Sequence, residues 1–131
     1  MPATKGAASA VAVSGAFKVF AGIGSGVRAN PERAVQQALE GLPRALQGYP
    51  HRTGILRIDT MSGNCEEATL IASSLLGADV RLAGGAAGDE LLMEKTFVAA
   101  GRRAETDAIV LAMVFSKSPL GVGASHGHRP V

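Results

Sequence analysis

Apolar and polar positions alternate along the chain with two different periods, and these predict both strands and helices. Residues 17–23 and 54–60 are short, mostly apolar runs that end near glycines and predict strands. Both faces of the first run are partly apolar, as expected for a strand covered on both faces. Residues 31–46 and 65–76 repeat apolar side chains at helical spacing. A third short run, residues 80–83, precedes a pair of glycines. This order predicts parallel strands joined by right-handed helical crossovers.

The first predicted helix has clear signals at its start and in its middle. Asn30 is a good N-cap, and Pro31 fits the first helical position, where its missing N–H is not needed. Gly41 and Pro43 interrupt the pattern further on. Because an interior proline removes a hydrogen bond and costs about 3 kcal/mol, we expect a kink or a break near Gly41.

The second predicted helix is delimited at both ends. Asn64 is followed three residues later by Glu67, which is the spacing of a capping box. Gly77 provides the stop, since glycine adopts the left-handed conformation that ends many helices.

The last part of the chain has a different organisation. Residues 94–100, 107–115 and 119–126 predict three strands joined by short polar links, without a helix between them, so we expect an antiparallel meander. The predicted fold is therefore α/β, with a mixed β-sheet of about six strands (βαβαβ followed by an antiparallel meander) packed against two helices. Residues 1–16 lack a strong period and are expected to be a loose leader before a domain spanning residues 17–131.

Composition and charge exclude several classes of protein. With 47% apolar and 18% charged residues, the chain is not disordered over its main body. A net charge of +2, scattered basic residues and few aromatic side chains argue against nucleic-acid binding. A single cysteine, Cys65, excludes an internal disulfide and fits a reducing compartment. No apolar run approaches the roughly 20 residues that cross a bilayer, and the N-terminus makes a poor signal peptide, so a cytoplasmic location is expected.

A glycine-rich segment is the first candidate for ligand binding. Gly84, Gly85 and Gly88 follow a predicted strand and lead to a carboxylate, Asp89. A backbone with so few side chains can present N–H groups to an anion, and Asp89 can reach an amine. The alternative is a glycine turn in which Asp89 accepts hydrogen bonds from its own backbone.

The end of the chain is the second candidate, because Ser125, His126 and Arg129 lie close together there, with His128 among them. A metal site is not expected, since the two histidines have no third ligand nearby. Ser125 and His126 would point to opposite faces of a strand, which opposes a nucleophile–base pair. His126 and Arg129 can instead donate hydrogen bonds to a carboxylate, and a solvated polar loop is the alternative.

Two weaker signals carry little chemistry. Gly24 and Gly26 resemble a loose dinucleotide-binding turn, but no acidic residue follows at the required distance. Cys65 lies at a predicted helix N-terminus, yet Glu66 and Glu67 beside it oppose thiolate formation. No cofactor and no catalytic motif are expected.

Four segments in order carry a resemblance to a known family: GGAAGD at 84–89, TFV at 96–98, DAIVLA at 107–112 and GVGASHGHRPV at 121–131. Together they resemble the N-terminal part of FIST domains, over residues 17–131. This resemblance implies a sensory module of intracellular signal transduction, with small ligands such as amino acids and no established catalytic residues. The matching residues are Gly84, Gly85, Gly88, Asp89, Ser125, His126, Gly127 and Arg129.

The chain departs from the family pattern in two ways. His128 stands where an aromatic residue is usual, so a metal-binding histidine pair is not implied. The family normally continues into a C-terminal part, whereas this chain stops at Val131, so we expect a truncated domain. The missing part, or a signalling output domain, is then an expected partner, and self-association is a further possibility.

Three hypotheses of function follow. In the first, the domain senses a small polar ligand: Asp89 pairs with its amine, and Arg129 or His126 with its carboxylate. In the second, the chain is a hydrolase or transferase that uses Ser125, His126 or Cys65. In the third, it is an interaction module whose sheet edge or apolar face meets the missing part or another subunit.

Overall fold

A computed structural model gives the fold and describes residue 12, residues 14–88 and residues 95–123. Most of the expected leader, residues 1–11 and 13, lies outside these residues, so the domain boundary at residue 17 stays a prediction. The described elements are β1 (Phe17–Ser25), α1 (Pro31–Leu39), β2 (His51–Asp59), a short 3-10 helix η1 (Thr60–Ser62), α2 (Cys65–Leu76), β3 (Arg81–Ala87), β4 (Val98–Ala100), β5 (Arg103–Glu105) and β6 (Ala108–Ser116).

The main sheet has four strands in the order β1-β6-β2-β3. Strand β6 runs antiparallel to both β1 and β2, whereas β2 and β3 are parallel. Strands β4 and β5 form a separate two-stranded hairpin. The predicted α/β class, the mixed sheet and the two helices are confirmed, with six strands divided between two sheets.

The position of β6 differs from the predicted meander. It does not pair with the strand before it but lies between β1 and β2. Its Val110 lies opposite Ile23 of β1, and its Leu111 lies opposite Leu56 of β2. Eight of its nine residues are buried, so it needs neighbours on both edges and cover on both faces. Of the predicted strand 119–126, residues 119–123 have no strand structure, and the rest lie outside the described residues.

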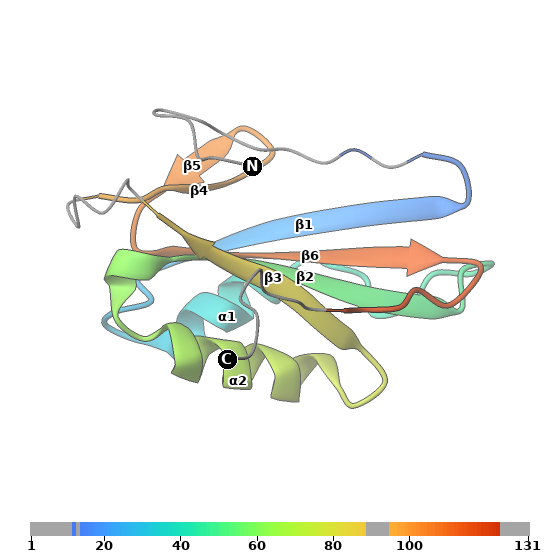
Figure 1. Cartoon of the computed structure of the whole chain (residues 1–131), viewed down its shortest axis with the longest axis horizontal. Helices are drawn as coiled ribbons and strands as arrows, with labels where there is room; N and C mark the ends of the chain where they lie inside the picture. The colour runs from blue at the N-terminus through green and yellow to red at the C-terminus, as the bar shows by residue number, and fades with distance from the viewer. Residues whose placement is uncertain (1–11, 13, 89–94, 124–131) are drawn as a thin grey trace, which may run out of the picture.

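Both helices cover one face of the main sheet, and the β4–β5 hairpin lies on its other side (Figure 1). On the helix side, Ala34 and Ala38 of α1 lie directly against β1, where a side chain at Gly24 or Gly22 would collide with their carbonyl oxygens. The larger core continues from α1 to α2 through Leu56, Ile58, Ile109, Leu111 and the small residues Ala68 and Ala72.

The hairpin covers one end of the opposite face. Val98 packs there with Ile23, Ala108 and Val110 in a second cluster. The carboxylate of Glu105 accepts a hydrogen bond from the Ser25 hydroxyl, and it also accepts one from Arg103 at 2.6 Å. The hairpin is thereby attached to the end of β1.

The helix signals give mixed results. The Asn30 side chain accepts a hydrogen bond from the Arg33 N–H at 3.0 Å, so this cap is confirmed. The helix ends at Leu39, and Gly41 has a φ of +80°, which confirms the predicted break. The second helix also stops at Gly77 as predicted, and no described helix has the length and apolarity needed to cross a bilayer.

The capping box predicted at the start of α2 is wrong. Asn64 precedes the helix, but its side chain caps nothing. Its amide nitrogen instead donates to the carbonyl oxygens of Val27 at 3.1 Å and Arg28 at 2.9 Å. The side chain therefore fastens the loop after β1 to α2, a long-range role that competes with the local cap.

Candidate functional site

The parallel strands β1, β2 and β3 end on the same side of the sheet, which is where ligands bind in many open α/β sheets. At this end Asp59 is 2% exposed. Its carboxylate accepts hydrogen bonds from the Met61 N–H at 2.9 Å, the Asp107 N–H at 2.5 Å and the Thr96 hydroxyl. Asp59 thus joins η1, the segment before β4 and the start of β6.

A second set of bonds holds the loop after β1 in this network. The carbonyl oxygen of Asp107 accepts from the N–H groups of Gly26 at 2.8 Å and Val27 at 3.2 Å, and its carboxylate accepts from the Arg28 N–H at 2.9 Å. The Arg28 guanidinium donates to the carbonyl oxygens of Met61 and Ser62. These polar groups are occupied by the protein's own backbone, so they build the end of the sheet and are not free for a ligand.

An open groove of about 640 Å³ lies between α2 and the edge strand β3. Its size falls within the range of small-molecule sites, about 300–1,000 Å³. Leu56, Ile58 and Leu82 form its apolar floor, and the backbone of residues 83–86 forms one wall. The other wall is the flank of α2, which contributes Cys65, Glu66, Thr69, Leu70 and Ser73.

The walls of this groove provide several binding groups. Glu66 is exposed, and its carboxylate has no hydrogen-bond or ion-pair partner in the described part of the chain. Among the described strands, β3 pairs only with β2, so its outer N–H and C=O groups face the groove side without a strand partner. Gly84 and Gly85 add no side chains of their own to this backbone, and the Arg57 guanidinium lies 3.2 Å from the place that a Cβ at Gly85 would take. The groove can therefore bind an amine, an apolar group and a hydrogen-bonding group together.

The structure places only part of the predicted site. Gly84 and Gly85 line the groove, but they belong to β3, which runs on to Ala87, and not to a loop after a shorter strand. The strand continues because its parallel pairing with β2 reaches Asp59. Gly88 follows β3 and is exposed, and a Cβ added there would have nothing within 4 Å.

The other predicted site residues lie outside the described residues, so the pocket shared by Asp89 and Arg129 stays a prediction. The same holds for the roles assigned to Ser125 and His126, and for Gly127 and His128.

The thiol of Cys65 lies at the inner end of the groove. It is 3.8 Å from the Ser62 hydroxyl and donates to the carbonyl oxygen of Asp59 at 3.5 Å. Neither neighbour is a base that would take up the thiol proton, so these contacts favour a packing role.

Sequence reasoning missed the α2 wall of the groove. Glu66, Leu70 and Ser73 are spaced by four and three residues, which places them on one flank of a helix. In the sequence, Glu66 stands out only for its effect on Cys65. The spacing is a usable signal, but the sequence alone does not show that this flank borders a strand edge.

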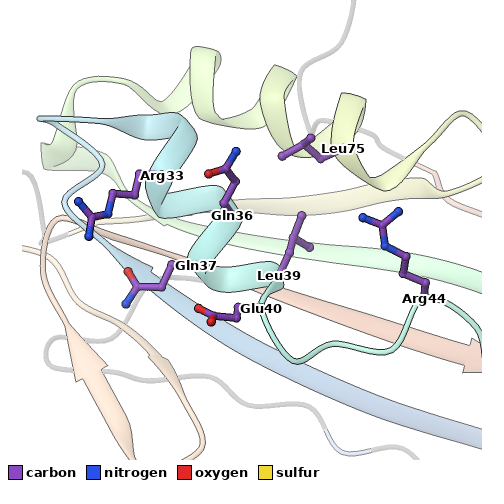
Figure 2. Close-up of a pocket in the computed structure, with 7 residues that line it drawn as sticks. All are labelled: Arg33, Gln36, Gln37, Leu39, Glu40, Arg44 and Leu75. Atoms are coloured by element: carbon purple, nitrogen blue, oxygen red, sulfur yellow. The ribbon is translucent and has the colours of Figure 1, made fainter.

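A second hollow of about 620 Å³ lies beside α1, and Figure 2 shows the side chains around it. They spread to different sides of the helix: Gln37 and Glu40 extend on one side, and Gln36 on the side of α2 (Figure 2). The Gln37 amide oxygen already accepts from the Ser25 N–H at 3.1 Å. Because its polar groups do not converge, this hollow is the weaker candidate.

The comparison with protein families supports the resemblance seen in the sequence. The family model of the FIST N domain matches residues 3–131, nearly the whole chain. No curated protein matches the chain. The chain therefore belongs to the FIST N domain family, a family of sensory domains in signal transduction.

Proposed function

We propose that this domain senses a small metabolite with an amine and an apolar portion, such as an apolar amino acid, in the groove between α2 and β3. One observation carries this proposal. An unpaired carboxylate, Glu66, and an uncovered strand edge at Gly84 and Gly85 border the same apolar groove in the described part of the chain.

Each part of the groove would bind a different part of the ligand. Glu66 would pair with the amine through a charge-assisted hydrogen bond. Outer N–H groups near Gly84 and Gly85 would donate to a carboxylate or carbonyl oxygen, and Leu70 and Leu82 would cover the apolar portion. In this proposal the predicted residues Asp89, Ser125, His126 and Arg129 add polar contacts at the end of β3, beyond Gly88.

Hydrogen bonds connect the two walls of the groove to the rest of the domain, so a bound ligand would affect residues outside the groove. The Thr60 hydroxyl donates to the carbonyl oxygen of Ala87, at the end of β3. The Cys65 thiol, at the start of α2, donates to the carbonyl oxygen of Asp59. A ligand that draws α2 and β3 together would therefore act on the Asp59 network, which holds the start of β6.

Isothermal titration calorimetry against a panel of amino acids tests the proposal. We expect at least one apolar member to bind, and Glu66→Gln to weaken it about tenfold or more, because hydrogen bonds to charged groups contribute about 1.5–3 kcal/mol. Glu67→Gln is the matched control: it removes the same charge one residue away, outside the groove lining, and should change the affinity less than twofold. A ligand bound equally well by Glu66→Gln would contradict the assignment.

Two further variants locate the site. If Arg33→Ala, on α1, weakens binding and Glu66→Gln does not, the ligand occupies the hollow of Figure 2. Asp89→Ala and Arg129→Ala test the predicted contribution of the residues beyond β3, and unchanged affinity in both would remove them from the site.

A further inference from the structure

Within the part of the chain that the structure describes, the outer edge of β3 is long and unprotected. Arg81 is its only charged residue, and residues 82–87 are Leu, Ala, Gly, Gly, Ala and Ala. Among the described strands only β2 pairs with it. Exposed edges in natural proteins are usually blocked by lysines, prolines or inward-pointing charges, because a row of free N–H and C=O groups recruits another strand.

The opposite edge of the sheet contrasts with this one. Strand β1 carries an exposed lysine, Lys18. At its other end the Ser25 hydroxyl donates to Glu105, which holds the β4–β5 hairpin beside the strand. These are two of the usual ways to block an edge, and the described residues provide neither for β3 between residues 82 and 87.

The helix beside the β3 edge is also incompletely covered. Leu70 is 65% exposed, although it lies on the flank of α2 that borders the groove. It is near the middle of α2, as Gly84 is at the middle of β3, and both residues line the same groove. A single axis can therefore pass close to the centres of both elements.

We propose that two copies of this chain pair their β3 edges antiparallel about a two-fold axis at Gly84. The pairing would join the two four-stranded sheets into one and place both α2 helices on the same face, on either side of the seam. Leu70 of each copy would then cover the groove of the other. This pairing takes up the outer N–H groups near Gly84 and Gly85, so it excludes the hydrogen bonds that the ligand of the proposed function would make there. The dimer itself does not rest on the proposed function.

The charge pattern fits an antiparallel pair of identical strands. Centred on Gly84, the pairing places Arg81 opposite Ala87 of the second copy, so the two arginines lie about 20 Å apart at 3.3 Å per residue. Charges at that distance are largely screened at physiological salt. A parallel pairing would instead bring the two arginines together. The charges of β3 itself are thus compatible with two-fold pairing, and the Arg57 guanidinium beside Gly85 is the charge that the interface has to accommodate near the axis.

Sedimentation equilibrium of the whole chain, without added ligand, tests this inference. The wild type should have twice the monomer mass at high concentration. Leu70→Glu, which brings like charges to the seam, and Ala86→Lys, which adds a charge to the edge, should each weaken association at least tenfold. Leu75→Glu is the matched control: it is the same substitution at another exposed position of the same helix, beside the hollow of Figure 2 and outside the groove, and it should leave association unchanged.

Circular dichroism would check that each variant is folded. Because the two variants lie on different elements, the test still works if one of them does not fold. A wild type that stays monomeric, or a dimer that resists both variants, overturns the inference. Ligand binding by a monomeric wild type would leave the proposed function standing without the dimer. A dimer that binds no panel member would support the dimer and contradict the proposed function.

Discussion

Two missing side chains in β1 allow α1 to approach the sheet closely. At Gly22 and Gly24 the helix backbone takes the space where a Cβ would be, against the carbonyl oxygens of Ala38 and Ala34. Protein interiors are packed as densely as organic crystals, so there is no free space at this contact for even one added carbon.

Gly24→Ala should therefore destabilise the domain by roughly 1–3 kcal/mol or more, as overpacked cores do. Urea unfolding measures the loss. Gly121→Ala is a suitable control, because nothing lies within 4 Å of its new side chain, and it should stay within about 0.5 kcal/mol of the wild type. Equal effects at both positions would show that close approach of α1 is not the cause.

At the same scale, Asp59 joins three separate segments through one carboxylate. Asp59→Ala would leave the N–H groups of Met61 and Asp107 and the Thr96 hydroxyl without their acceptor. An unsatisfied buried group costs about 1–3 kcal/mol. The bond from Thr96 is buried and the other two are partly buried, so we expect a loss of about 2 kcal/mol or more in chemical denaturation. Thr96→Val removes only one of the three bonds and should cost clearly less. If the two variants lose the same stability, the bonds from Asp59 to Met61 and Asp107 do not contribute to the stability of the fold.

At the scale of elements, the β4–β5 hairpin depends on its attachment to β1. The hydrogen bond from Ser25, and then that from Arg103, lower the pKa of Glu105 below its ordinary value of 4.5. A lowered pKa in the folded state means that the ionised carboxylate stabilises the fold. This contribution is complete above the ordinary pKa and is lost as the pH falls through the lowered one.

Thermal unfolding from neutral to strongly acidic pH tests this attachment. Wild type should unfold at a higher temperature than Glu105→Gln at neutral pH, and the difference should disappear in acid. Because the Glu105 side chain is partly exposed to solvent, we expect a small difference. Glu67→Gln removes the same charge without affecting the hairpin. A difference between wild type and Glu105→Gln that persists unchanged in acid would contradict the role given to ionised Glu105.

At the scale of the whole molecule, the last described strand is the centre of the sheet. β6 pairs with β1, the first strand, and with β2. Its contacts therefore join segments that are far apart in the sequence. Such long-range pairing makes the main sheet one cooperative unit, because β6, residues 108–116, is the strand partner of β1 among the described strands.

Hydrogen exchange should show this organisation directly. Backbone amides of Ile109 to Phe115 should exchange slowest, since both edges of β6 are paired and its side chains are buried, whereas those of β4 and β5 should exchange through local opening. Mass spectrometry of peptides from the two regions provides the comparison. Equal protection in the hairpin and in β6 would contradict a sheet centred on β6.

The candidate site was only half predictable. Gly84 and Gly85 stand out because a run of residues without side chains is visible in any sequence. Glu66 and Leu70 do not, because an exposed helix flank has no special pattern until a strand edge is known to lie beside it. Asn64 shows the same limit: its local spacing predicts a cap, and distant carbonyl oxygens take its side chain instead.

The sequence by itself determined the α/β class, the start of α1 at Asn30 and the ends of the helices near Gly41 and Gly77. These features depend on interactions within a few residues, such as caps, glycine conformations and the periods of apolar side chains. Only the tertiary structure decided that β6 enters between β1 and β2 and that β3 is left as an edge against α2. Strand order follows from which apolar faces can be buried together, and that choice is made between segments far apart in the chain.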